Sequence, residues 1–213
     1  MHAESVYLFR HALLRDAAYQ LQLPGARAQL HALAFAVIEE LCGGRAPATK
    51  RDESGELTFE PHSTDSAAHE LADHARFART LGRQAGRRAE FESMLAAQVM
   101  YLPRAAAYAE ERFQLELSTR LWKEHAELVS GAEQAASLRR AAVVLFRAGR
   151  TRFAEPLLER AVALFRGAGL PRREGVALGN LASVYQDIGR LEKATHCFVR
   201  ALALHRRAGD RRR

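Results

Sequence analysis

The 213-residue sequence contains only two cysteines, Cys42 and Cys197, which lie in opposite halves of the chain. They form no CxxC pair, which argues against a disulfide framework and against a thiolate metal site. No apolar run reaches the roughly 18 residues that a membrane-spanning helix needs. The first residues, MHAESVYLFRHALLRD, also lack the basic-then-apolar order of a secretory signal. We therefore expect a cytoplasmic protein with reduced cysteines.

Catalytic patterns are missing as well. No phosphate-binding GxxxxGK[ST] loop is present, because the Gly82–Gly86 segment is followed by arginines. Cys197 follows His196, but neighbours on a helix point in different directions and make no nucleophile–base pair. Acidic neighbours such as Glu39–Glu40 indicate exposed helix faces. We expect no enzymatic activity and no cofactor.

One cluster of histidines and carboxylates raises the question of a metal site. It comprises His62, His69, Glu70, Asp73 and His74. A helical zinc pair needs ligands four residues apart. His69 and His74 are five apart and therefore point about 140° away from each other on a helix. We interpret these residues as solvated positions and expect no metal.

The formal net charge of +7 and the isoelectric point near 10.0 raise the question of a nucleic-acid partner. The lysines are only Lys50, Lys123 and Lys193, so 29 of the 32 basic residues are arginines, a bias typical of GC-rich bacterial genomes. Apart from Arg211–Arg213, the arginines are spread over every segment instead of gathering on one face. This spread argues against nucleic-acid binding.

Helical periodicity covers most of the chain. Residues 8–42 predict two helices broken at Pro24–Gly25. The second carries one apolar stripe, formed by Leu30, Leu33, Val37, Ile38 and Leu41. Residues 43–64, rich in glycine, proline, serine and charge, predict a loop or linker. No strand is expected, because the only β-like text, residues 57–59, is too short.

A helical connector is expected over residues 65–100. Ser63, Thr64 or Asp65 would cap its first turn, and its buried edge would comprise Leu71, Ala75, Ala78 and Leu81. Further helices are predicted over 88–100, from Pro103 to about residue 112, and over 114–129.

The last part of the chain repeats itself at an offset of 40 residues. Leu138 matches Leu178, Gly149–Arg150 matches Gly189–Arg190, Ala154 matches Ala194, and Ala161 matches Ala201. Each unit therefore predicts two helices, with small residues where the backbones approach closely. We expect a repeat array over 101–213, with a degenerate copy at 101–132 and two clear copies at 133–172 and 173–213.

The segment LGNLASVYQDIGRLEKATHCFVRALAL, residues 178–204, resembles the tetratricopeptide repeat. Its signature positions fall on Leu178, Leu181, Ala182, Tyr185, Gly189, Ala194, Phe198 and Ala201. The preceding unit carries Leu138, Leu145, Gly149, Ala154, Leu158 and Ala161, and the degenerate copy Ser118, Trp122, His125 and Leu128. The resemblance implies an all-α fold of helical hairpin repeats, an α-solenoid preceded by a short helical region. Leu158 and Phe198 would fill the space between paired helices.

The resemblance also implies a non-catalytic scaffold that binds a protein or peptide in a concave groove lined by the first helix of each pair. The groove positions fall on Arg139, Arg140, Val143, Arg147, Val176, Asn180, Ser183, Gln186 and Asp187. Arginine forks pair with carboxylates and asparagine can hold an extended backbone, so we expect an acidic or C-terminal-carboxylate ligand. The alternative to a binding groove is that these residues are ordinary solvated positions on exposed helix faces. Val199, Leu202 and Leu204 would form an uncapped face, which predicts self-association.

Residues 8–42, with Phe9-Arg10-His11-Ala12-Leu13 most distinctive, resemble a segment that follows the nucleotide-binding domain of bacterial STAND-class signalling ATPases. This resemblance implies a place in a larger signalling protein, linked to an ATPase, kinase or cyclase. The alternative function is a DNA-associated regulator with a winged-helix N-terminus, which would show strongly salt-dependent duplex binding.

Overall fold

The computed structural model describes residues 12–52, 56–207 and 209, and within them the fold is all-α, as expected. The helices are α1 (Ala12–Gln20), α2 (Pro24–Leu41), α3 (Ala68–Gln84), α4 (Ser93–Glu111), α5 (Leu115–Leu128), α6 (Gly131–Arg147), α7 (Thr151–Gly167), α8 (Pro171–Asp187) and α9 (Leu191–Arg207). Two 3-10 turns, η1 (Ser63–Ala67) and η2 (Arg88–Phe91), and two strands, β1 (Lys50–Arg51) and β2 (Leu57–Thr58), complete it. Residues 9–11, part of the segment that resembles STAND-class proteins, and the terminal arginines 211–213 lie outside the described residues.

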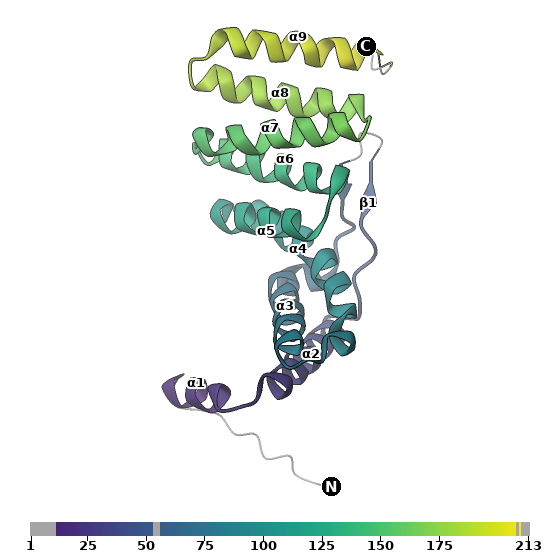
Figure 1. The fold of residues 1–213 in the computed structure, drawn as a ribbon, viewed down its shortest axis with the longest axis vertical. Coiled ribbons are helices and arrows are strands. Elements are labelled where there is room, and N and C mark those ends of the chain that lie inside the picture. Colours follow the sequence, from purple (N-terminus) through teal and green to yellow (C-terminus); the bar gives the residue numbers. More distant parts are fainter. Residues whose placement is uncertain (1–11, 53–55, 208, 210–213) are drawn as a thin grey trace.

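The helices stack in chain order along the long axis of the molecule, with α1 and α9 at opposite ends (Figure 1). From α2 onward, each helix packs against the next one in the sequence. This nearest-neighbour packing is the arrangement of a helical-repeat solenoid. Within the described ranges, no helix combines the length and the apolar character needed to cross a membrane.

The second half contains two helix pairs of identical dimensions. Helices α6, α7, α8 and α9 each have 17 residues, and α6 and α8 begin 40 residues apart, at Gly131 and Pro171. Gly149 and Gly189 end the first helix of each pair with φ angles of 70° and 79°. Glycine adopts this left-handed conformation without the steric cost that a side chain would add. The 40-residue repeat is thus two equal helices with two short turns.

Helix α3 buries the four residues that its periodicity indicates, Leu71, Ala75, Ala78 and Leu81. The expected cap residues lie instead in η1, the 3-10 turn before α3, and the side chain that caps η1 is His62, whereas Ala67 at the start of α3 makes no side-chain capping bond. The backbone N–H of Thr64 donates to His62 Nδ1 over 3.3 Å, and the N–H of His62 donates to Asp65 Oδ2 over 2.8 Å. A histidine was not anticipated here, since serine, threonine and aspartate are the usual caps.

Helix α2 does not bury the apolar stripe that its sequence suggests. Leu33 is 60% exposed and Leu41 is 81% exposed, and Leu30 and Val37 are also exposed. The buried positions are Ala28 and Phe35. Helix α2 packs mainly against α3, so one side is covered and the leucines lie on the other.

Helix α4 is continuous, so the expected helix start at Pro103 is wrong. Pro103 lies buried inside α4. Proline removes the N–H that would bond to the carbonyl of Val99, four residues earlier. The ring of His125 in α5 hydrogen-bonds the Val99 backbone in its place, and the helix runs on through Pro103.

The expected linker carries two short strands that the sequence analysis did not predict, because two residues are too few to show an alternating pattern. We call residues 50–52 and 56–58 the arm: β1 and β2 pair antiparallel within it, with Lys50 opposite Thr58. Figure 1 shows the arm extending past α5 toward the end of the stack where α9 lies.

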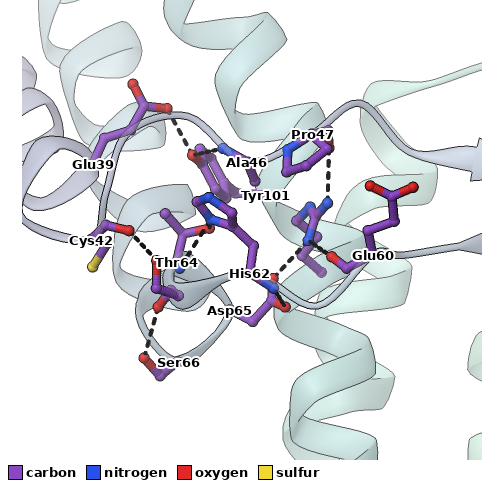
Figure 2. A network of polar contacts seen from close by, with 12 residues as sticks. Glu39, Cys42, Ala46, Pro47, Glu60, His62, Thr64, Asp65, Ser66 and Tyr101 are labelled. Carbon is purple, nitrogen blue, oxygen red and sulfur yellow. Dashed lines mark hydrogen bonds and ion pairs between the residues drawn. The ribbon is translucent and has the colours of Figure 1, made fainter.

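The base of the arm is fixed by Arg104 of α4, whose side chain is fully buried. Arg104 donates to the carbonyls of Pro47 and Glu60 over 2.8 and 3.2 Å and to Asp65 Oδ1 over 2.8 Å. Figure 2 shows Pro47, Glu60 and Asp65 gathered around this point. Because a buried guanidinium needs partners for its charge and its N–H groups, Arg104 holds both arm roots firmly against α4.

Candidate binding face

The candidate site is the face that α6 and α8 share, where a small pocket of about 100 Å³ lies between the two helices. Three of the predicted groove residues line this pocket: Val143, Asn180 and Ser183. Leu158 of α7 also lines it, together with Ala142, Phe146 and Val184. Three of the predicted groove positions, which come from two different repeats, thus lie on one surface of the structure.

Asn180 supplies an uncommitted donor in this pocket. Its amide nitrogen Nδ2 is buried, and no hydrogen-bond partner for it exists in the described part of the chain. The hydroxyl of Ser183, by contrast, donates to the Gly179 carbonyl of its own helix over 3.3 Å. A buried amide without a partner is costly, so a ligand carbonyl at this point would restore the missing bond.

The groove arginines Arg140 and Arg147 lie beside this pocket on α6, and both pair with Glu110 of α4. Arg140 reaches Glu110 Oε2 over 3.3 Å, and its guanidinium also lies 5.4 Å from the centre of the Trp122 ring. Two guanidinium groups thus share one carboxylate. The cluster keeps one positive charge in excess.

Arg139 departs from the expectation of an exposed donor, because only 6% of it is exposed. It forms an ion pair with Glu56 of the arm, so the arm covers it. Burial lowers the pKa of Arg139, and the carboxylate of Glu56 opposes that shift. The internal partner is 83 residues away in sequence.

The remaining predicted groove positions do not line the pocket between α6 and α8. Val176 is half-buried and Gln186 is exposed. Asp187 accepts a hydrogen bond from the Thr151 hydroxyl of α7 over 2.7 Å. Asp187 therefore joins two helices and is not part of the pocket lining.

The predicted packing positions are mostly buried. These are Leu138, Ala154, Leu158, Ala161, Leu178, Leu181, Ala182, Tyr185, Ala194 and Ala201. Tyr185 donates to Glu159 Oε1 over 2.9 Å, and burial followed by this hydrogen bond raises its pKa. Phe198 differs, because it is 44% exposed and does not fill the space between α8 and α9. Cys197, one residue earlier, is buried instead.

Phe198 belongs to a wider apolar surface on α9. Leu191, Val199 and Leu202 are 64%, 63% and 50% exposed, whereas Leu204 is partly buried against the core. The reason is geometric: α9 packs against α8, and no other described helix covers its far side.

Successive repeats are joined by equivalent ion pairs. Arg150 follows the turn glycine of one unit and reaches back to Glu116 at the start of α5. Arg190, at the matching position of the next unit, reaches back to Glu155 near the start of α7. The Gly–Arg pair noted in the sequence therefore combines a turn residue with a bridge to the second helix of the preceding unit.

The histidine cluster resolves into two separate sets. His62 caps η1, whereas His74 Nδ1 lies 2.8 Å from Nδ1 of His31 in α2. The Tyr19 hydroxyl lies 2.8 Å from the other ring nitrogen of His31. Burial, and next the charge of His74, lower the pKa of His31. Among the described residues, no three histidine, cysteine, aspartate or glutamate side chains are placed to hold a metal ion.

A larger cleft of about 710 Å³ lies between α3 and α5 and extends to the turn after α6. Its acidic and basic groups largely pair with one another, as Asp73 does with Arg76 and Glu116 with Arg150. We place the candidate site at the α6–α8 pocket, where a buried donor lacks a partner among the described residues.

Sequence reasoning missed three participants in the candidate face. Phe146 could have been found, because it lies three residues after Val143 and so on the same side of α6. Glu110 and Glu56 carry no local signal, since each reaches α6 from a distant part of the chain.

The fold and the candidate face together define an all-α helical-repeat protein. In agreement, residues 133–207 match the family model of the tetratricopeptide repeat, which covers α6 to α9 and leaves the first five helices unmatched. Repeats of this family generally mediate protein–protein interaction. No curated protein sequence matches the chain.

Two solved structures resemble the chain over most of its length. Both contain nearly identical TPR-like repeats from Podosopora anserina, named for a kinesin light chain. One, a variant with a single substitution, is 16% identical with a TM-score of 0.48 and covers 93% of this chain and 94% of its own. The other is 17% identical with a TM-score of 0.47 and covers 94% and 99%.

Proposed function

We propose that the protein is a non-catalytic scaffold that holds an extended protein segment across α6 and α8. The observation that carries this proposal is the unpaired Asn180 amide in the pocket between the two helices. An extended chain presents a backbone carbonyl at every residue, which is the acceptor that this amide needs. Val143 and Phe146 beside it offer an apolar contact for one side chain.

The ligand we propose is acidic. Arg140 and Arg147 share Glu110, so this end of the face carries an excess positive charge that a carboxylate of the ligand would balance. Arg140 is also held against Trp122, which fixes its guanidinium for a directed contact.

The experiment is a selection of peptides from a random display library on the intact protein, followed by affinity measurement on variants. Asn180→Leu removes the amide and fills the pocket, so selected peptides should lose at least about tenfold in affinity, the equivalent of one lost hydrogen bond. The control, Gln84→Leu, removes an exposed side-chain amide at the end of α3, away from α6 and α8, and should leave binding unchanged. Equal binding to all three proteins, or the absence of any binding peptide, would refute the proposal.

We further propose that this scaffold acts within a bacterial signalling system in the cytoplasm. The support is the resemblance of residues 8–42 to the segment that follows the nucleotide-binding domain in STAND-class proteins. Sequencing the DNA on both sides of the region that encodes residues 1–213 tests this proposal. The absence of an in-frame or adjacent ATPase, kinase or cyclase gene would contradict it.

A further inference from the structure

The arm makes its distal contacts on the same helix that carries the candidate face. The Nη2 atom of Arg51 lies 3.4 Å from Oε1 of Glu133 in α6, and Glu56 pairs with Arg139 of α6. Arg139 lies one helical turn before Val143, which lines the Asn180 pocket. The carboxylate of Glu56 therefore occupies a position next to the proposed ligand path.

The contact covers the arginine that would otherwise be available to a ligand. Arg139 is 6% exposed with Glu56 against it, whereas Arg147 on the same helix is exposed. Asp52, on the other side of the arm, also acts electrostatically on Arg139. The arm thus brings negative charge to the place where we expect an acidic partner to bind.

The arm is held firmly at its base, and its contacts farther out differ in strength. At the base, the buried Arg104 bonds both roots, Pro47 and Glu60. Nearer the tip, the strand pairing comprises two residues on each side, and the side chains of Arg51 and Glu133 are 32% and 43% exposed. Ion pairs at such exposure contribute little to stability. Leu57 of β2, however, packs against the hydrophobic core, so the part of the arm that a ligand can displace is the Glu56 carboxylate, whose side chain is 31% exposed.

We propose that the arm is an internal competitor for the binding face: Glu56 occupies Arg139 until the carboxylate of an acidic partner displaces it. This inference rests on the proposed function of the α6–α8 face. A tethered group acts at a local concentration in the millimolar range, so even a weak contact blocks weakly binding peptides. Only a ligand that also engages the Asn180 pocket gains enough to displace Glu56 from Arg139.

The probe for the experiment is a fluorescent peptide with the sequence of residues 47–60, PATKRDESGELTFE. Its target is a shortened protein in which Gly-Ser-Gly replaces residues 50–58. The short linker suffices because Lys50 and Thr58 are cross-strand neighbours, about 5 Å apart. Pro47 and Glu60 remain, so Arg104 keeps its carbonyl partners.

The peptide should bind the shortened protein about tenfold more tightly than the intact one, the change expected for an arm that is closed nine-tenths of the time. Arg139→Gln in the shortened protein should remove the gain. In the intact protein, Glu56→Gln should raise peptide affinity severalfold. The matched change at the arm base, Glu60→Gln, should have no effect.

Equal peptide binding to intact and shortened proteins, or no binding to either, would overturn the inference. If circular dichroism shows that the shortened protein does not fold, the intact Glu56→Gln variant alone tests the inference. A peptide affinity of this variant equal to that of the wild-type protein would then overturn the inference. Failure of this inference can be distinguished from failure of the proposed function. The Asn180→Leu comparison tests the proposed function separately, because it uses peptides selected from the library and a protein with an unmodified arm.

Discussion

His125 of α5 and Ser137 of α6 form a buried polar pair, with imidazole Nδ1 and hydroxyl Oγ 2.7 Å apart. His125 is 1% exposed, and its ring also hydrogen-bonds the backbone of Val99 in α4. One side chain therefore links three consecutive helices. It does so next to Pro103, which cannot supply the helical bond to Val99 itself.

This burial predicts a loss of stability in acid. Desolvation lowers the pKa of His125 from 6.5 to about 4 in the folded protein. Since the unfolded chain takes up a proton near pH 6.5 and the folded chain does not until about pH 4, stability is full above pH 6.5 and falls as the pH drops between these values. The total loss is about 3 kcal/mol.

Urea unfolding at pH 7 and pH 5 measures the effect. His125→Gln should flatten the pH dependence by about 2 kcal/mol over this interval. The exposed His196→Gln variant is the control and should keep the wild-type slope. An unchanged slope in His125→Gln would show that another group is responsible.

The charge cluster around Glu110 predicts the outcome of reversing the groove arginines. Arg140→Glu with Arg147→Glu would place two carboxylates beside Glu110, and we expect a loss of about 1 to 2 kcal/mol, because these side chains are partly exposed. Adding Glu110→Arg should restore most of it. Thermal unfolding of the double and triple variants tests this, and equal melting temperatures would argue against a real interaction.

Two glycines of α8 and its following turn predict opposite responses to the same substitution. A Cβ atom at Gly179 or Gly189 would meet nothing within 4 Å, so only the backbone conformation differs. Gly189 has a φ of 79°, and Gly189→Ala should cost about 1 to 2 kcal/mol. Gly179 lies inside α8, and Gly179→Ala should stabilise by about 0.5 to 1 kcal/mol. Chemical unfolding of both variants should show opposite shifts of the midpoint.

Phe165 and Phe198 are a matched pair for the repeat packing. Phe165 is 1% exposed and Phe198 is 44% exposed. Phe165→Ala should cost about 3 to 5 kcal/mol, whereas Phe198→Ala should cost about 1 to 2 kcal/mol, because much of its ring already contacts solvent. Calorimetry distinguishes the two, and a Phe198 variant as damaged as the Phe165 variant would show that α9 is covered in solution.

The features that sequence analysis predicted well depend on neighbours within one repeat. Ala161 is buried and Gly189 ends its helix because 17-residue helices and short turns place them there, and both positions recur 40 residues apart. The all-α fold follows from such local regularities. The position of Asn180 on the shared face could be predicted in the same way, but its lack of a partner could not.

What the sequence did not predict depends on contacts that are distant in the chain. The buried Arg139 pairs with Glu56, and His125 hydrogen-bonds the Val99 backbone beside Pro103; both partners are far away in the sequence. The exposure of Leu33 could not be predicted either. An apolar stripe has the same helical periodicity in the sequence whether another helix covers it or not. Which side of α2 is covered depends on where α3 lies.

The arm also bears on how the array comes apart. In a stack of helix pairs each unit contacts only its neighbours, so unfolding can begin at either end and proceed helix by helix. The arm connects a segment rooted beside α4 directly to α6, across 83 residues between Glu56 and Arg139. While Glu56 stays paired with Arg139, helices α4 to α6 are thereby joined into one cooperative block, whereas α9 packs mainly against α8 at the end of the stack and can melt separately. Amide exchange should therefore be fastest in α9 and uniformly slow from α4 through the first half of α6.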